Sequence, residues 1–254
     1  MSARLNSQLW LPANWPAPAN VHAGTSWRQG GISQGAYASM NLAMHVGDDT
    51  SAVMENRRRL GLPTEPIWLN QVHGLTVVDA GRALAERSEQ DIEADAAYTA
   101  QAGVICAVLT ADCLPLLLCD RAGGCVAAVH AGWRGLATGI IDRAVTALQL
   151  PGEQLLAWLG PAIGPNAYEV GEEVREAFLR IDADARMAFR LSRPGHWWMD
   201  IYQLARQQLG QRGVTEVYGG DHCTWQEADR FYSYRRDGVT GRMASVIWFE
   251  SDGT

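Results

Sequence analysis

Polar residues interrupt long apolar stretches at two places in the middle of the chain, and reactive side chains lie at both interruptions. The first, TADC at residues 110–113, divides a run that would otherwise continue as one buried strand over residues 104–119. The second, HAGWRG at residues 130–135, follows a short apolar run over residues 125–129. Apolar runs bounded by turn residues are typical of buried strands. The pattern therefore predicts neighbouring strands whose ends present a cysteine and a histidine.

The rest of the chain alternates between short apolar runs and segments with helical spacing. Further strands are predicted at residues 21–27, 67–69, 76–79 and 155–159. Helices are predicted from Thr50 onward, with Asp49 or Thr50 as the N-cap, and at residues 136–150, 169–181 and 200–209. A terminal hairpin is predicted from residues 231–236 and 243–249, and a loop or short outer helix from residues 81–93.

Composition indicates one soluble globular domain over residues 1–254, in which residues 1–20 are an irregular, proline-rich lead-in that cannot form a central strand. Apolar residues make up 47% of the chain, and 26 glycines and 10 prolines provide many turns. No apolar run approaches the length of a membrane span, and the first residues lack the pattern of a secretion signal. We therefore expect a cytoplasmic protein without a membrane partner.

Charge and cysteine content exclude several classes of function. The net charge is −7 and every basic residue is arginine, so a Schiff-base lysine mechanism is excluded. An acidic chain without a basic block is not expected to bind nucleic acid, because neutralising phosphates needs clustered positive charge. Five cysteines, an odd number, in a chain without an export signal favour free thiols over a disulfide framework.

His73, Cys113 and His130 are the candidate metal ligands. Their separations, 40 and 17 residues, match no local zinc-finger spacing, but each lies at the end of a predicted strand or beside one. Two imidazoles and one thiolate suit a borderline-soft ion such as zinc, and three protein ligands leave a fourth position for reactants. The alternative is a buried cysteine with two hydrogen-bonded histidines.

The same residue types also permit nucleophilic catalysis. Cys113 would attack, a histidine would act as base, and Asp112 or Asp95 would orient the imidazole. In a metal site Asp112 could instead accept a proton beside the ion, and Asp95 could either orient a ligand imidazole or cap a turn. A cytidine-type zinc deaminase is disfavoured, because neither H-x-E nor P-C-x-x-C occurs.

Copper is limited by the histidine count. A multicopper oxidase needs a blue-copper centre and a further imidazole-rich cluster, commonly supplied by H-x-H pairs. This chain has six histidines, and no two are separated by one residue. Copper could occupy a single site, but an ordinary multicopper centre cannot be built.

Arginines offer candidate anion sites. Arg134 lies where the predicted helix over residues 136–150 begins, so free backbone N–H groups and the helix dipole could assist it. An ion-pair role for Arg134 is the alternative. In the run Arg57-Arg58-Arg59, adjacent helical positions point about 100° apart, so at most one or two of the three share a face.

Seven stretches resemble the successive motifs of one family, in order from about residue 21 to residue 249. They are SMNLAMHVGDD, WLNQVHG, ADAAYT, LTADCLPLLL, AVHAGWRGL, WLGPAIGPNAYEVGEEV and FYSYRRDGVTGRMASVIW. On these motifs the chain is similar to the YfiH, or laccase-domain, family. Its members are variously described as polyphenol oxidase, purine nucleoside phosphorylase and peptidoglycan editing factor.

The resemblance implies an α+β single domain with α/β/β/α layers and mixed sheets, akin to toxins of the cytotoxic necrotizing factor type. It implies a zinc site formed by His73, Cys113 and His130. The implied activity is phosphorolysis of adenosine, inosine and methylthioadenosine to the free base and a ribose 1-phosphate, with adenosine deamination alongside.

From these expectations we assign candidate roles. Cys113 and Asp112 are the expected catalytic groups, and zinc with Arg134 or Arg57 is expected to hold phosphate. Asn41 and Arg235 are expected near the nucleoside. The alternatives are a cysteine-type amidase that edits peptidoglycan precursors, a polyphenol oxidoreductase, or a binding protein without turnover.

Overall fold

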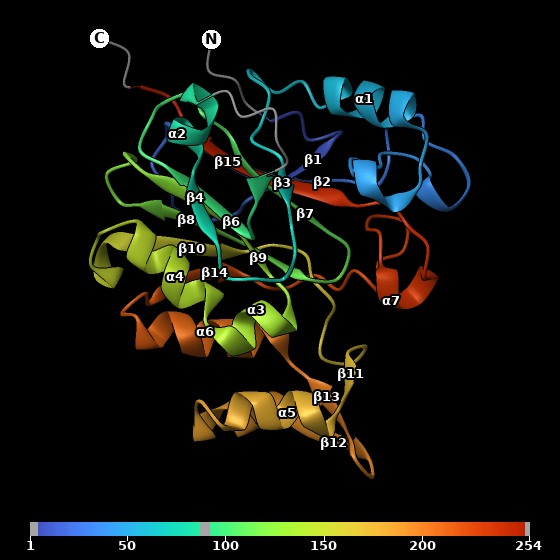
Figure 1. Ribbon diagram of the computed structural model, residues 1–254, viewed down its shortest axis with the longest axis vertical. Helices are drawn as coiled ribbons and strands as arrows, with labels where there is room; N and C mark the ends of the chain where they lie inside the picture. Colours follow the sequence, from blue (N-terminus) through green and yellow to red (C-terminus); the bar gives the residue numbers. More distant parts are fainter. Residues whose placement is uncertain (1–4, 87–91, 252–254) are drawn as a thin grey trace.

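Two β-sheets pack face to face, and helices cover their outer faces, in a computed structural model that describes residues 5–86 and 92–251 (Figure 1). Residues around α1 (Thr50–Arg59), such as Leu42 and Leu60, cover the outer face of one sheet, and α3 (Trp133–Thr138), α4 (Ile140–Ala147) and α6 (Ile201–Gln211) cover the outer face of the other. The expected fold class, α+β with α/β/β/α layers and mixed sheets, is confirmed. No helix among the described residues is long and apolar enough to span a bilayer.

The first sheet has four strands and is antiparallel throughout. Its spatial order is β1 (Trp10–Pro12), β2 (Val21–Ser26), β15 (Met243–Phe249) and β7 (Cys106–Thr110). Every residue of β15 and β7 is buried, as expected for strands with both faces covered. β1 is an edge strand, so a short strand forms within the lead-in that was expected to be irregular.

The second sheet has six strands and mixes parallel with antiparallel pairs. Its spatial order is β14 (Glu216–Gly219), β10 (Leu155–Leu159), β8 (Leu114–Asp120), β9 (Val126–Ala131), β6 (Ala96–Thr99) and β4 (Val77–Asp79). Two smaller sheets complete the strands, namely β11 (Glu169–Gly171), β13 (His196–Met199) and β12 (Phe189–Arg193), and β3 (Leu69–Asn70) with β5 (Ile92–Glu93).

The helices surround the sheets (Figure 1). The α-helices are α1 (Thr50–Arg59), α2 (Ala80–Ala85), α3 (Trp133–Thr138), α4 (Ile140–Ala147), α5 (Glu172–Leu179), α6 (Ile201–Gln211) and α7 (Tyr234–Asp237). Short 3-10 helices occur at η1 (Gly35–Tyr37), η2 (Met44–Val46), η3 (Gly152–Gln154) and η4 (Ala183–Ala188). Asp49 caps α1, because its carboxylate accepts a hydrogen bond from Ala52 N at 2.8 Å.

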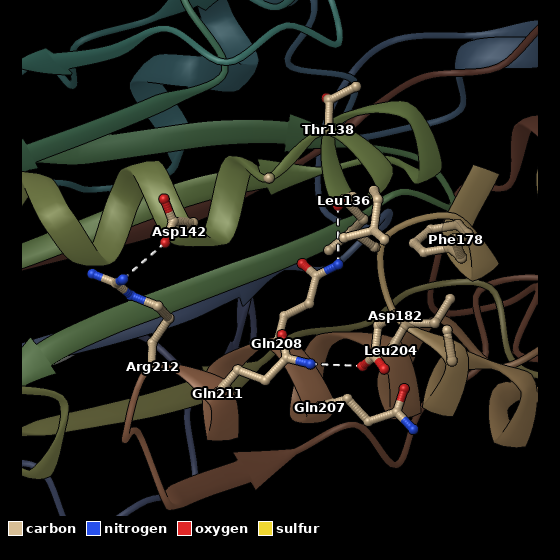
Figure 2. Close-up of a pocket in the computed structure, with 13 residues that line it drawn as sticks. Leu136, Thr138, Asp142, Phe178, Asp182, Leu204, Gln207, Gln208, Gln211 and Arg212 are labelled. Carbon is tan, nitrogen blue, oxygen red and sulfur yellow. Dashed lines mark hydrogen bonds and ion pairs between the residues drawn. The ribbon is translucent and has the colours of Figure 1, made fainter.

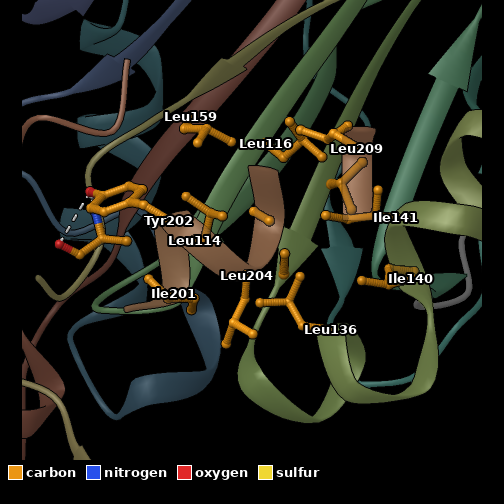
Figure 3. Close-up of a cluster of buried hydrophobic side chains, with 14 of the residues drawn as sticks. Leu114, Leu116, Leu136, Ile140, Ile141, Leu159, Ile201, Tyr202, Leu204 and Leu209 are labelled. Carbon is orange, nitrogen blue, oxygen red and sulfur yellow. Dashed lines mark hydrogen bonds between the residues drawn. The ribbon is translucent and has the colours of Figure 1, made fainter. Parts of the chain in front are cut away.

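The apolar core divides into layers that follow the sheets. One cluster fills the space between the two sheets and includes Val108, Leu117 and Ile247. A larger cluster joins the outer face of the six-stranded sheet to α3, α4 and α6. Figure 3 shows strand residues such as Leu116 facing helix residues such as Leu204. Because β7 and β8 lie in different sheets, the residues that connect them must cross this double layer.

Two predicted helices differ from the structure, and a third predicted segment, the loop or short outer helix, is described in part. The helix expected at residues 136–150 is interrupted at Gly139, whose φ of +100° ends α3 and starts α4. The helix expected at residues 169–181 begins only after Gly171, because its first three residues form β11. Residues 81–93 contain most of the short helix α2 and β5, while residues 87–91 lie outside the described part of the chain.

The prediction of a terminal hairpin is wrong. The Ser233 hydroxyl accepts a hydrogen bond from Arg236 N at 3.2 Å and thereby starts the turn of α7 where a strand was predicted. Strand β15 pairs instead with β2 and β7, both of which come from the first half of the chain. The apolar run located this strand, but its partners depended on contacts that are distant in the sequence.

Candidate metal centre

Cys113 lies where the chain crosses from one sheet to the other. Residues 111–113 connect β7 of the first sheet to β8 of the second, and Cys113 immediately precedes β8. Asp112 has a φ of +93°, an uncommon conformation for a residue with a side chain. Strain of this kind persists where the surrounding structure enforces it, and it is frequent at functional sites.

His130 is brought to Cys113 by strand pairing. It lies near the end of β9, opposite Pro115 on β8, which is two residues from Cys113. The His130 side chain is only 4% exposed. Its Nδ1 donates a 2.7 Å hydrogen bond to Asp95 Oδ1 and thus leaves Nε2 to act as a ligand.

His73 comes from the loop between β3 and β4, and the Asp95 carboxylate holds that loop in place. The amides of Val72, His73 and Gly74 donate to this carboxylate at 3.3, 2.9 and 2.6 Å. His73 also has a positive φ of 61°. A single, fully buried carboxylate therefore orients one histidine through its ring and the other through its backbone.

The three donor atoms lie close enough to share one ion. All are within 4.8 Å of one another, and Cys113 Sγ lies 3.7 Å from His73 Nε2. Tetrahedral zinc bonds, about 2.3 Å to sulfur and about 2.0–2.1 Å to nitrogen, separate two such ligand atoms by about 3.6 Å. In the part of the chain that the structure describes, this is the one group of three or more His, Cys, Asp or Glu residues with such proximity.

Gly132 keeps the space beside these ligands open. A Cβ added at residue 132 would lie 2.7 Å from His73 Cδ2 and 3.1 Å from Cys113 Sγ. Both separations are shorter than van der Waals contact, so only glycine fits beside the two ligands as they stand. The donor set, the donor separations and this glycine together fit a bound metal ion with nitrogen and sulfur ligands.

Electrostatics favour the ionised cysteine. Burial raises the pKa of the Cys113 thiol, but the adjacent His130 and hydrogen bonds from both histidines outweigh burial and lower that pKa overall. Burial lowers the pKa of His130, but Cys113 and Asp95 more than offset burial and raise it. Burial also raises the pKa of Asp95, but its hydrogen bonds keep that pKa below the ordinary value. The site thus stabilises a thiolate, which is the form that binds metals.

We expect Asp95→Asn to lower zinc affinity by about 10- to 100-fold, the usual loss when an outer partner of a ligand is changed. The asparagine would remove the charge that orients His130 and would direct an amide donor at backbone N–H groups. Competition with a chelator measures the affinity. Asp120→Asn is the matched control, since Asp120 is another buried carboxylate that accepts from backbone amides, those of Gly124 and Cys125. Equal affinities in the two variants would contradict the assigned role of Asp95.

The candidate ligands line a cleft of about 440 Å³, within the range of about 300–1,000 Å³ that is typical of small-molecule sites. Most of its lining residues have polar side chains, and two of them are arginines. The lining residues are His45, Gln71, His73, Leu109, Thr110, Ala111, Cys113, His130, Arg134, Tyr234 and Arg242. Gln71 fixes one wall, because its amide exchanges two hydrogen bonds with the backbone of Leu109, at 2.7 and 2.8 Å.

A second, more enclosed cavity of about 270 Å³ lies among α3, α4, α5 and α6 (Figure 2). Gln208 reaches across it to the carbonyl of Leu136 at 3.0 Å, and Arg212 pairs with Asp142 at 3.1 Å. Its lining contains glutamines and aliphatic side chains but no histidine or cysteine. This cavity therefore lacks the histidine and cysteine side chains that the cleft beside Cys113 provides.

Of the arginines expected to bind substrate, Arg134 lines the cleft. Its guanidinium lies 4.5 Å from the centre of the Trp133 ring and makes no hydrogen bond to the described residues. Arg57 does not line the cleft. Its Nε donates to Leu42 O at 3.0 Å, and its guanidinium lies 4.0 Å from the Trp68 ring centre.

The other candidates lie beside the cleft and hold its walls. Both carboxylate oxygens of Asp112 are engaged at 2.6 Å, one by the Thr224 hydroxyl and the other by Arg235 N. The Arg235 side chain donates to Glu169 O at 2.7 Å. Asn41 is fully buried, and its Oδ1 accepts from Arg242 N at 3.0 Å. Asp112 and Asn41 are thus engaged by neighbouring residues, and their expected direct roles stay predictions.

Seven cleft-lining residues were not among the sequence candidates, and four of these have large polar side chains, namely His45, Gln71, Tyr234 and Arg242. All four lie inside motifs that carry the family resemblance, but no spacing rule separates them from their neighbours. Tyr234 lies inside the first strand of the incorrectly predicted hairpin, and Arg242 lies just before its second strand, so the wrong element hid their position.

Curated relatives match nearly the whole chain. A protein of Pseudomonas aeruginosa named purine nucleoside phosphorylase is 54% identical over 244 residues, covering 95% of this chain and 98% of that protein. The protein named purine nucleoside phosphorylase YfiH in Escherichia coli is 51% identical over 247 residues, covering 95% and 99%.

Solved structures agree with the sequence matches. The crystal structure of Neisseria meningitidis protein NMB0706 superposes with a TM-score of 0.90 at 50% identity, covering 95% of this chain and 99% of that one. YlmD from Geobacillus stearothermophilus gives a TM-score of 0.86 at 33% identity, covering 98% of each chain. The model of the family described as multi-copper polyphenol oxidoreductase laccase matches residues 22–250. The chain therefore belongs to this laccase-domain, or YfiH, family.

Proposed function

We propose that this chain is a zinc-dependent purine nucleoside phosphorylase. Its substrates would be inosine, adenosine and methylthioadenosine, and its products the free base and a ribose 1-phosphate. Deamination of adenosine would accompany this reaction. The names of the relatives support the reaction class, and the His-Cys-His donor set supports zinc over harder ions.

The proposal depends on one observation, that two arginines and the three candidate ligands line the same cleft. Arg134 has an uncommitted guanidinium. Arg242 donates from Nη1 to Thr240 O and Gly241 O, at 2.8 and 3.0 Å, and its Nε and Nη2 have no hydrogen-bond partner among the described residues. Both side chains could therefore direct donors at a phosphate.

The reaction exchanges one bond at the anomeric carbon of the ribose. A phosphate oxygen forms a bond to C1′, the C1′–N9 bond breaks, and the base leaves with the electron pair and takes up a proton. Positive charge develops on the sugar, so an anion held beside it lowers the barrier. A bound zinc ion would supply positive charge that holds and orients the phosphate. Arg134 and Arg242 would fix the phosphate from the other wall of the cleft.

We assign the remaining candidates supporting parts. Asp112 would hold α7 against the loop that carries Cys113, and Asn41 would hold the backbone of Arg242. Arg57 and Arg235 would add positive potential near the substrate. This agrees with His45, whose pKa is lowered first by burial and then by the charges of Arg242 and Arg57.

Product analysis with inosine tests the function. We expect the zinc-loaded protein to release hypoxanthine and ribose 1-phosphate in equal amounts, and only when phosphate is present. Removal of zinc with a chelator should abolish both products, and added zinc should restore them. Hypoxanthine with free ribose in phosphate-free buffer would contradict phosphorolysis and indicate a hydrolase.

We expect Arg134→Gln to raise the KM for phosphate by about tenfold or more, since a charge-assisted hydrogen bond contributes about 1.5–3 kcal/mol. The KM for inosine should change little. Arg143→Gln, on the nearby helix α4 but outside the cleft, is the control. An unchanged KM for phosphate would remove Arg134 from the phosphate site.

A cysteine-type amidase is the second candidate, because a cysteine 3.7 Å from a histidine nitrogen is also the arrangement of a cysteine hydrolase. The two candidates differ in their need for metal. An amidase would keep its activity after zinc removal and would not require phosphate.

A further inference from the structure

Among the residues that the structure describes, Tyr234 is the one phenylalanine, tyrosine or tryptophan that lines the cleft. Its side chain is 61% exposed, although large aromatic side chains are usually well buried. Its hydroxyl makes no hydrogen bond to a described residue. The proposed metal chemistry uses neither the ring nor the hydroxyl, so the position of this side chain needs another explanation.

Tyr234 is held in a fixed relation to the metal ligands. It is the first residue of α7, and Ser233 caps that helix. The next backbone amide, Arg235 N, donates at 2.6 Å to the carboxylate of Asp112, which directly precedes Cys113. One carboxylate thus connects the loop that carries Cys113 to the helix that carries Tyr234.

Arg242 lies beside the Tyr234 ring, with its guanidinium carbon 5.8 Å from the ring centre. This is within the range of a cation–π contact, which extends to about 6 Å. The contact restrains the ring, and most of the residue's surface stays open to solvent beside the cleft that it lines. A flat, restrained and solvent-exposed ring is suited to stacking with a planar base, which every purine provides.

We propose that Tyr234 is the purine platform of the cleft. The base of the nucleoside stacks on the phenol ring, while its ribose points toward the metal ligands and Arg134. This assignment rests on the proposed function and adds to it the residue that recognises the base. It requires the aromatic ring and not the hydroxyl.

The test compares wild-type protein with Tyr234→Ala, Tyr234→Phe and Trp225→Ala. Trp225 is a matched control, since it is 43% exposed and does not line the cleft. The measurements are the KM values for inosine and for phosphate, the inhibition constant of hypoxanthine, and the zinc content. Zinc content and the KM for phosphate report whether the rest of the site is intact.

We expect Tyr234→Ala to raise the KM for inosine and the inhibition constant of hypoxanthine by about tenfold, within the range for loss of one stacked base. The KM for phosphate and the zinc content should stay at wild-type values, and Tyr234→Phe and Trp225→Ala should match the wild type. An unchanged KM for inosine in Tyr234→Ala would overturn the assignment of Tyr234 as the purine platform. A rise in the KM for phosphate equal to the rise in the KM for inosine would overturn it too. Neither result would contradict phosphorolysis itself. Failure of the wild-type protein to convert inosine would overturn the proposed function itself, and the platform with it.

Discussion

Cys113→Ser is expected to retain its fold but lose both bound zinc and inosine phosphorolysis. A serine hydroxyl is not ionised at neutral pH, whereas the environment of Cys113 lowers its thiol pKa and so favours a thiolate, the ligand form. The loss of zinc affinity should exceed the about 10- to 100-fold that a changed outer partner costs, because a direct ligand is removed. Elemental analysis and product formation from inosine measure the two effects.

Cys223→Ser is the control for this variant. Cys223 is also a free and nearly buried cysteine, and its sulfur accepts a hydrogen bond from Gly164 N at 3.2 Å. A serine oxygen can accept the same hydrogen bond, so zinc content and activity should be preserved. Full activity in Cys113→Ser without zinc would reject both the metal mechanism and the cysteine amidase.

Gly132→Ala is expected to exclude the metal by shape alone. Its new Cβ would lie 2.7 Å from His73 Cδ2 and 3.1 Å from Cys113 Sγ, so one or both ligands must move. Neither ligand is changed chemically, and the loss of zinc would therefore show that the site needs this particular geometry. The variant should fold, since His73 belongs to a loop and its side chain is exposed.

Gly210→Ala is the matched control for this substitution. Gly210 lies in α6, and a Cβ there would have no neighbour within 4 Å. Alanine in a helix is favoured over glycine by about 1 kcal/mol, so this variant should be slightly more stable and fully active. Wild-type zinc affinity in Gly132→Ala would contradict the close packing of Gly132 against the ligands.

The approach of the three candidate ligands could be predicted from the apolar pattern. Polar residues placed where buried strands end must lie together if those strands are neighbours, and β8 and β9 are paired. Two roles were open for Asp95, orienting a ligand imidazole or capping a turn. Its contact with His130 depends on β6 lying next to β9. Local sequence indicates which residues end a strand, but strand order decides which ends meet.

The opposite wall of the cleft could not be predicted in the same way. Tyr234 begins α7, which starts where the Ser233 hydroxyl accepts a hydrogen bond from Arg236 N, and Arg242 follows the irregular segment after that helix. Asn41 shows the same limit, because its role is to accept a hydrogen bond from Arg242 N, 201 residues away along the chain. Contacts over such separations leave no periodic signal in the sequence.

The central claim is that His73, Cys113 and His130 hold one metal ion, and anomalous diffraction at the zinc absorption edge tests it most directly. For crystals of protein loaded with zinc, we predict a single anomalous peak about 2.3 Å from Cys113 Sγ and about 2.0–2.1 Å from a nitrogen of each histidine. A peak at any other position, or zinc-loaded crystals without a peak at these three side chains, would contradict the account.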